Sequence, residues 1–142
     1  MVQNILPTRE RLARLRKVES PCFIYCGQLD SIAHLISCPH NTEVTRPLVN
    51  CIASYVDNST AENITILNLK LEESQELPIA WLVATCLGQV WEERAAGKQV
   101  KLMNTKAVLE AKVALLKETY LKYNYLHNSA FLLEEMINLH FN

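Results

Sequence analysis

Three cysteines and a histidine lie close together near the start of the chain, in the pattern Cys22-x3-Cys26-x7-His34-x3-Cys38. Thiolate sulfur and imidazole nitrogen are the ligands that Zn²⁺ prefers, and a Cys3His set is typical of closed, tetrahedral structural sites. His34 and Cys38 are four residues apart, so on a helix they project from the same face. The sequence therefore predicts a structural zinc site with two ligands on a turn and two on a helix.

The same residues allow other interpretations. A tight zinc knuckle usually has two residues between its cysteines, whereas Cys22 and Cys26 are separated by three. His40 could replace a ligand that points away from the metal. Cysteine is also among the most buried residue types, so the cluster could be ordinary packing. We expect that role for Cys51 and Cys86, which lie in apolar segments with helical spacing.

Positive charge is concentrated at the start of the chain. The net charge of the whole chain is −1 and its pI is about 6.4, yet residues 1–19 are strongly basic. Such a run can contact nucleic-acid phosphates, and Phe23 or Tyr25 on the turn can stack on unpaired bases. A solvated helix face explains the run equally well. The candidate nucleic-acid contacts are Arg9, Arg11, Arg14, Arg16, Lys17 and Tyr25.

Helices must position most of these side chains. Capping residues, prolines and apolar spacing predict six helical segments, the second with Asp30 as its N-cap and the fourth with Pro78 in its first turn and Gly97 as its stop. Apolar alternation predicts a strand or extended connector over residues 63–71. The predicted helices cover residues 8–18, 31–37, 43–56, 78 to 94 or 96, 105–123 and 129–139, and a turn or small ribbon covers residues 22–27.

The apolar spacing also predicts how the helices pack. The fourth helix is apolar on all sides from Ile79 to Val90, which is typical of a buried central helix. The expected fold is mainly α, with a small zinc-binding turn-helix lobe (residues 1–42) and a bundle of three to four helices (residues 43–142), which could also form one unit. The packing residues expected on the last two helices are Leu109, Val113, Leu116, Tyr120 and Tyr123, and Phe131, Leu132, Met136 and Leu139.

Composition excludes several classes of protein. The chain has 142 residues, of which 49% are apolar and 20% charged, with only three glycines, unlike disordered or collagen-like chains. Its longest apolar stretch, Leu77–Trp91, is shorter than the about 20 residues that a bilayer crossing needs. The first residues lack the pattern of a secretory signal. We therefore expect no membrane association and an intracellular protein of the nucleus or cytoplasm.

The sequence offers no convincing catalytic group. The adjacent pairs Glu92–Glu93 and Glu134–Glu135 would point to different sides of a helix rather than to one reaction centre. Neither His127 nor His140 has a nucleophile near it in sequence, and the few glycines leave no phosphate-binding loop. We therefore expect no catalytic residues and no enzyme activity.

The order of several motifs along the chain is distinctive. Leu-Pro-Thr at residues 6–8 leads into the basic helix, Cys-x3-Cys-Gly follows at residues 22–27, and His-Leu and Cys-Pro come at residues 34–39. Trp-Leu-Val and Trp-Glu-Glu-Arg then appear at residues 81–83 and 91–94. Together these motifs resemble the zinc-binding C-terminal region of non-LTR retrotransposon reverse transcriptases and the tail that follows it.

The resemblance implies that Cys22, Cys26, His34 and Cys38 bind Zn²⁺ and that the region helps an attached polymerase to hold template RNA or target DNA. The expected partners are RNA or DNA, bound weakly and with strong salt sensitivity, and the parent reverse transcriptase. The chain has no Asp-Asp polymerase pair, so it would be a C-terminal fragment or a relic. The family pattern has Cys-x2-Cys where this chain has Cys-x3-Cys.

A helical protein-interaction module, domesticated from such an element, is the alternative. Its contact surface would be the seam over residues 109–123 or the terminal helix over residues 131–139, and it could form a homodimer.

Overall fold

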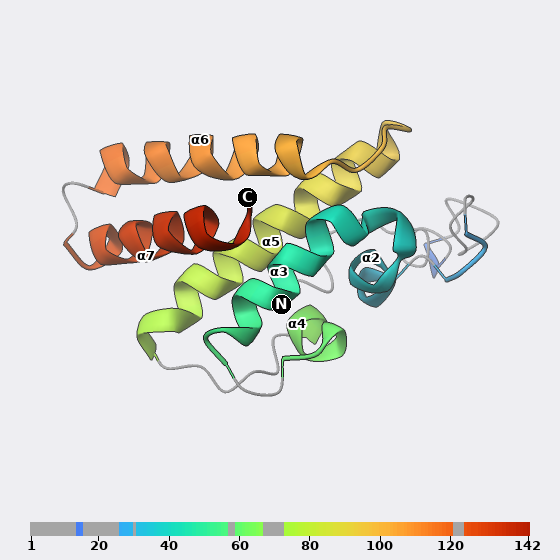
Figure 1. The fold of residues 1–142 in the computed structure, drawn as a ribbon, viewed down its shortest axis with the longest axis horizontal. Coiled ribbons are helices and arrows are strands. Elements are labelled where there is room, and N and C mark those ends of the chain that lie inside the picture. The colour runs from blue at the N-terminus through green and yellow to red at the C-terminus, as the bar shows by residue number, and fades with distance from the viewer. Residues whose placement is uncertain (1–13, 16–25, 30, 57–58, 67–72, 121–123) are drawn as a thin grey trace.

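The computed structural model of the chain describes residues 14–15, 26–29, 31–56, 59–66, 73–120 and 124–142. This part is mainly helical, with a small cysteine and histidine segment ahead of a helical bundle, which confirms the predicted fold class (Figure 1). The α-helices are α2 (Ile32–Ser37), α3 (Thr42–Ala53), α4 (Ala61–Ile66), α5 (Glu73–Ala95), α6 (Leu102–Tyr120) and α7 (Asn124–His140), and a 3-10 turn, η2 (Pro39–Asn41), joins α2 to α3.

The long helix α5 is the centre of the bundle. Helices α2, α3, α6 and α7 all pack against it. Its side chains are buried on several sides, as the apolar spacing predicts, because neighbours surround it. The fully buried residues of α5 are Ile79, Leu82, Val83, Cys86, Leu87 and Val90.

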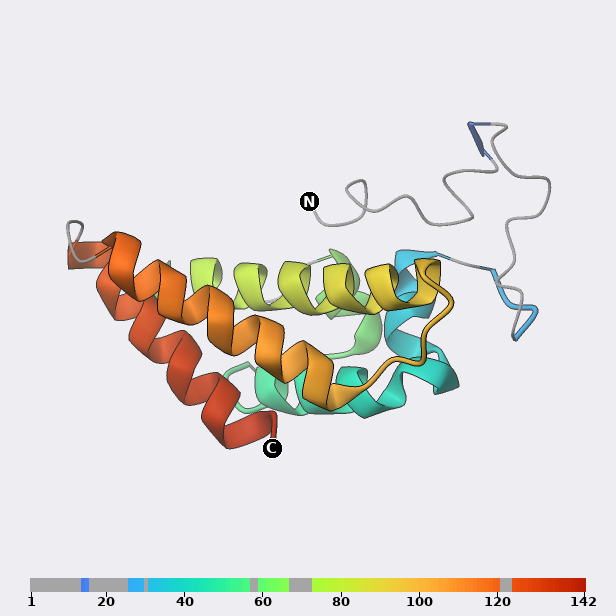
Figure 2. The same ribbon diagram turned by 90° about the horizontal axis from the view of Figure 1, so that it is seen from above.

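Helices α6 and α7 lie side by side and form the most extensive contact between two helices (Figure 2). Leu109 and Val113 are buried in this packing and Leu116 is half-buried, as predicted for the seam. The prediction for α7 was wrong at Phe131 and Leu139, which are exposed. The buried face of α7 instead repeats at spacings of three and four from residue 130, the period of a helix with one face on a core. It consists of Ala130, Leu133, Met136 and Ile137.

Hydrogen bonds hold both ends of the connection from α5 to α6 in place. The N–H of Lys98 donates to the carbonyl of Glu93 at 2.8 Å, and that of Gly97 to the carbonyl of Arg94 at 3.0 Å. Gly97 has φ +69°, so the pattern is a Schellman motif, and the predicted stop is confirmed. At the start of α6, the N–H of Leu102 donates to Glu43 of α3 at 2.8 Å. The connection is therefore fixed to the body of the fold.

Three predicted elements differ from the structure. Residues 63–66 belong to helix α4 rather than to a strand, because Thr60 caps this helix by accepting from the N–H of Asn63 at 3.2 Å. Helix α5 begins at Glu73, so Pro78 is inside the helix. Acidic residues at positions 73 and 76 favour a helix N-terminus there through the helix dipole. The N-cap of α2 is Ser31 rather than Asp30.

The predicted basic helix over residues 8–18 falls outside the described residues except at Arg14 and Leu15, both exposed. None of the helices described is both long and apolar enough to span a bilayer. Helix α2 and the end of α5 lie at one end of the bundle, and the end of α6 and the start of α7 lie at the other (Figures 1 and 2). The first of these two ends contains the candidate site.

Candidate metal centre

Helix α2 packs against the core with one face and presents the candidate ligand His34 on another. Ile32, Leu35 and Ile36 are buried in the core, where α2 packs against α3, α4 and α5. Ser31 caps the start of the helix, because its hydroxyl accepts from the N–H of His34 at 3.1 Å. His34 therefore projects from a short helix that is fixed by its apolar face.

Cys38 follows the last residue of α2 and is fully buried. Its backbone is extended, with ψ 128°, because a residue that precedes proline avoids the helical region. The N–H of Cys38 still donates to the carbonyl of His34 at 2.8 Å, so the two residues are held one helical turn apart. The side chain of Asn41 donates to the carbonyl of Leu35 at 2.9 Å and ties η2 to the end of α2.

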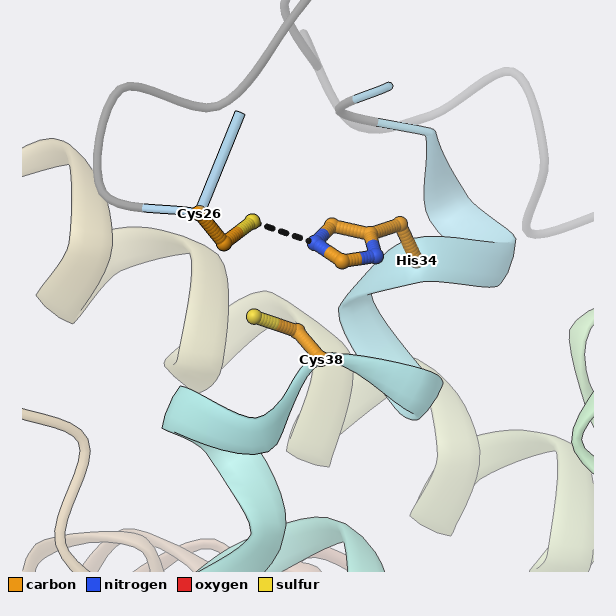
Figure 3. A group of neighbouring side chains, drawn as sticks. All are labelled: Cys26, His34 and Cys38. Atoms are coloured by element: carbon orange, nitrogen blue, oxygen red, sulfur yellow. Dashed lines mark hydrogen bonds between the residues drawn. The ribbon is translucent and has the colours of Figure 1, made fainter. Parts of the chain in front are cut away.

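Cys26 completes the group from a turn that precedes α2 in the sequence. One ligand atom from each of Cys26, His34 and Cys38 lies within 4.8 Å of the other two. Figure 3 shows the three side chains pointing toward one another, and Cys26 Sγ lies 3.1 Å from His34 Nε2. His34 and Cys38 are buried and Cys26 is half-buried. Two sulfur atoms and one imidazole nitrogen could therefore hold a metal ion.

The surroundings of Cys38 act on its thiol in opposite directions. Burial raises the pKa of Cys38, while a hydrogen bond from the backbone N–H of His40 and the positive charge of Arg94 lower it. The nearby sulfur of Cys26 raises the pKa again. A bound cation would favour the thiolate form of both sulfurs, so metal binding would release protons.

The described residues include only some of the predicted ligands and contacts. His40, the candidate substitute ligand, is exposed and is not part of the convergent group. Cys51 and Cys86 are both fully buried, which confirms that they are core residues. Burial raises the pKa of Cys51 to about 12 and also raises that of Cys86. The predicted site residues that lie outside the described part are Cys22, Arg9, Arg11, Arg16, Lys17 and Tyr25.

Sequence reasoning missed the contributions of α5 to this end of the molecule. Arg94 is more than 50 residues from Cys38 in the sequence, yet its charge acts on that thiol. The adjacent Glu93 is buried and accepts from the backbone N–H of Lys101 at 3.3 Å and from the Asn104 amide at 2.9 Å. The only sequence signal was a Glu-Arg pair at the end of a helix, which is normally a solvated pattern.

The chain was compared with protein-family models, with curated proteins and with solved structures, and none of the three comparisons gave a match.

Proposed function

We propose that the chain is a zinc-stabilised, nucleic-acid-binding accessory domain, similar to the C-terminal region of non-LTR retrotransposon reverse transcriptases. In this role it would hold template RNA or target DNA for the polymerase. The observation that supports the proposal best is the convergence of Cys26, His34 and Cys38 on one point. The order of the motifs around these residues, which resembles the order in that family, is the second support for the proposal.

Zinc is the metal that best fits the donor set. Soft thiolates favour Zn²⁺ over Mg²⁺ and Ca²⁺, which prefer oxygen ligands, and imidazole is also a common zinc ligand. A structural zinc site has four protein ligands, and the chain offers Cys22 as the fourth. The thiolates of Cys22, Cys26 and Cys38 and the imidazole of His34 would together form the Cys3His set.

The proposed zinc ion would attach the Cys26 turn to α2. Gly27, Gln28 and Leu29 in that turn are all exposed, so they add little apolar burial. Metal–ligand bonds would replace the apolar contacts that the turn lacks. The zinc ion would thus connect the basic residues 1–19 to the helical body, and we propose no catalytic step for it.

The proposed nucleic-acid contacts are the basic residues near the start of the chain. Of these, Arg14 lies in the described part and is exposed. Phosphate contacts of this kind are not sequence-specific and weaken steeply as the salt concentration rises. With a pI of about 6.4, the whole chain would bind weakly, and the attached polymerase would supply further affinity.

The test of nucleic-acid binding is charge reversal. The zinc-loaded chain with Arg11, Arg14 and Arg16 changed to Glu should lose retention on immobilised RNA and DNA at low salt. A control chain with Arg46, Lys101 and Lys112 changed to Glu carries the same net charge, and these three residues are exposed elsewhere on the fold. Equal retention of both chains would contradict the proposal.

A helical interaction module is the second candidate. The predicted seam is used inside the chain, because Leu109 and Val113 are buried. A dimer would therefore have to use apolar side chains that remain exposed, such as Leu115 on α6 and Leu139 on α7. Sedimentation at low and high salt separates the two candidates, since a salt-insensitive dimer would favour the interaction module.

A further inference from the structure

A cleft of about 550 Å³ adjoins the metal centre. One side is formed by η2, which begins immediately after Cys38, and the other by the end of α5 and the segment that leads to α6. The cleft therefore lies between the metal-binding segment and the central helix of the bundle. Of the convergent ligands, none of Cys26, His34 and Cys38 is among the described residues that line it.

Three of the residues that line the cleft have basic side chains. Arg94 and Lys98 come from the α5 side, and His40 comes from the η2 side. Glu43 is the one acidic residue among the described residues of the lining, and its carboxylate accepts from the N–H of Leu102 at 2.8 Å. The carboxylate thus has a structural role at the start of α6, and the charges of Arg94 and Lys98 together outweigh its negative charge among the described lining residues.

The backbone at the cleft is held in a fixed conformation. Gly97 and Lys98 belong to the Schellman motif, and the N–H of Lys98 donates to the carbonyl of Glu93 at 2.8 Å. Lys98 itself is exposed. The backbone at Lys98 therefore needs no ordering when its ammonium group binds an anion, which lowers the entropy cost of binding.

Asn41 contributes a different group to the lining. It is fully buried, its Nδ2 donates to the carbonyl of Leu35, and its Oδ1 has no hydrogen-bond partner among the residues that the structure describes. A lone acceptor repels an anion but accepts from a hydroxyl group or a water molecule. Because Asn41 is fully buried, an anionic group would bind on the side of Arg94 and Lys98 rather than at this oxygen.

We propose that this cleft binds a phosphate group, contacted by the side chains of Lys98 and Arg94. Guanidinium and ammonium groups form charge-assisted hydrogen bonds to phosphate oxygens, and guanidinium can do so in a bidentate manner. The inference rests on the proposed function only for the source of the phosphate, which would be a nucleic-acid strand. It places a phosphate contact on the helical body, in addition to the contacts proposed for residues 1–19.

The experiment is an amide-shift titration of the full zinc-loaded chain, first with inorganic phosphate and then with single-stranded RNA. Phosphate should shift the amide signals of residues 40–41 and 97–100 in a saturable way. The variant Lys98→Glu should weaken the affinity for phosphate about tenfold through loss of one charge-assisted contact. The matched control Lys112→Glu changes an exposed lysine in the middle of α6 and should leave the affinity within about twofold.

Two results would overturn the phosphate site: no saturable shift of these amides, or equal weakening by Lys98→Glu and Lys112→Glu. RNA that shifts the same amides at lower concentration supports a nucleic-acid strand as the source. A response to inorganic phosphate alone supports the cleft as a site for free phosphate and removes the strand as its source.

One variant distinguishes failure of the proposed function from failure of the phosphate site. In it, Arg11, Arg14 and Arg16 are changed to Glu. It should lose RNA retention while its response to inorganic phosphate remains unchanged. If it instead loses the response to inorganic phosphate, the cleft is not an independent site and the inference is contradicted.

Discussion

The turn at Cys26 and the helical body are held in place by different kinds of contact. The turn has one half-buried cysteine followed by three exposed residues, and its interactions converge on His34 and Cys38. The body has a continuous apolar core in which α5 is surrounded by four other helices. The comparison teaches that the turn, unlike the body, has little apolar burial to hold it in place, which is why we propose a metal ligand set there.

Metal removal should separate the two regions most clearly. Structural zinc sites in small domains contribute about 10 kcal/mol or more of apparent binding free energy. A chelator should therefore lower the hydrogen-exchange protection of the turn at residues 26–29, while α2, which is packed in the core, and the middle of α5 keep their protection. The measurement is hydrogen exchange by mass spectrometry with and without the chelator. Equal loss in both regions would show that the body also depends on the metal.

A cavity in the core should instead destabilise the helical body and leave metal binding unchanged. Leu82→Ala removes a fully buried side chain from α5 and should lower the free energy of unfolding by about 2–5 kcal/mol. Thermal and urea unfolding measure this loss, and the bound metal per folded chain should not change. Met103→Ala, at a residue that is 72% exposed, is the control and should change stability by less than about 0.5 kcal/mol. A similar loss in both variants would contradict the packing described for α5.

The buried carboxylate of Glu93 should stabilise the start of α6 through its hydrogen bonds. Glu93→Ala leaves the N–H of Lys101 and the amide of Asn104 without their acceptor, so stability should fall by about 1–3 kcal/mol. The neighbouring Glu92 is exposed, and Glu92→Ala should have little effect. Urea unfolding of both variants measures the difference. If Glu92→Ala is as costly as Glu93→Ala, the hydrogen bonds at α6 do not account for the loss.

Alkaline pH should weaken the body through its buried thiols. Burial raises the pKa of Cys51 from 9.0 to about 12. The contribution of the neutral thiol to the free energy of unfolding is therefore fully present below pH 9 and is lost as the pH rises toward 12. Over that window the free energy of unfolding should fall by about 1.4 kcal/mol per pH unit for this thiol. Cys51→Val should show a shallower fall between pH 9 and 11, measured by urea unfolding. An unchanged slope would show that Cys51 does not titrate on unfolding.

The elements that depend on local sequence were predicted well. Gly97 ends α5 because the positive φ of a C-terminal cap favours glycine. The all-round apolar spacing of α5 correctly placed it at the centre. The spacing of His34 and Cys38 put two of the three convergent side chains together, since they are four residues apart and α2 is helical up to Ser37.

The features that depend on contacts distant in sequence were not predictable. Met136 was predicted correctly, but only the positions of α3, α5 and α6 decide that Leu133 and Ile137 face the core beside it while Phe131 and Leu139 do not. Helix α4 consists of six residues whose alternating pattern resembles a strand. The charge of Arg94 acts on Cys38 only because α5 packs against α2, which no short-range pattern could indicate.

The metal content of the purified chain tests the central claim most directly. Protein prepared without added metal and measured by elemental mass spectrometry should contain about one zinc ion per chain, and Cys38→Ser and His34→Ala should contain almost none. Cys51→Ser should keep its zinc, because Cys51 is buried in the core outside the convergent group. A folded wild-type chain that contains no metal and takes up none when zinc is supplied would contradict the account.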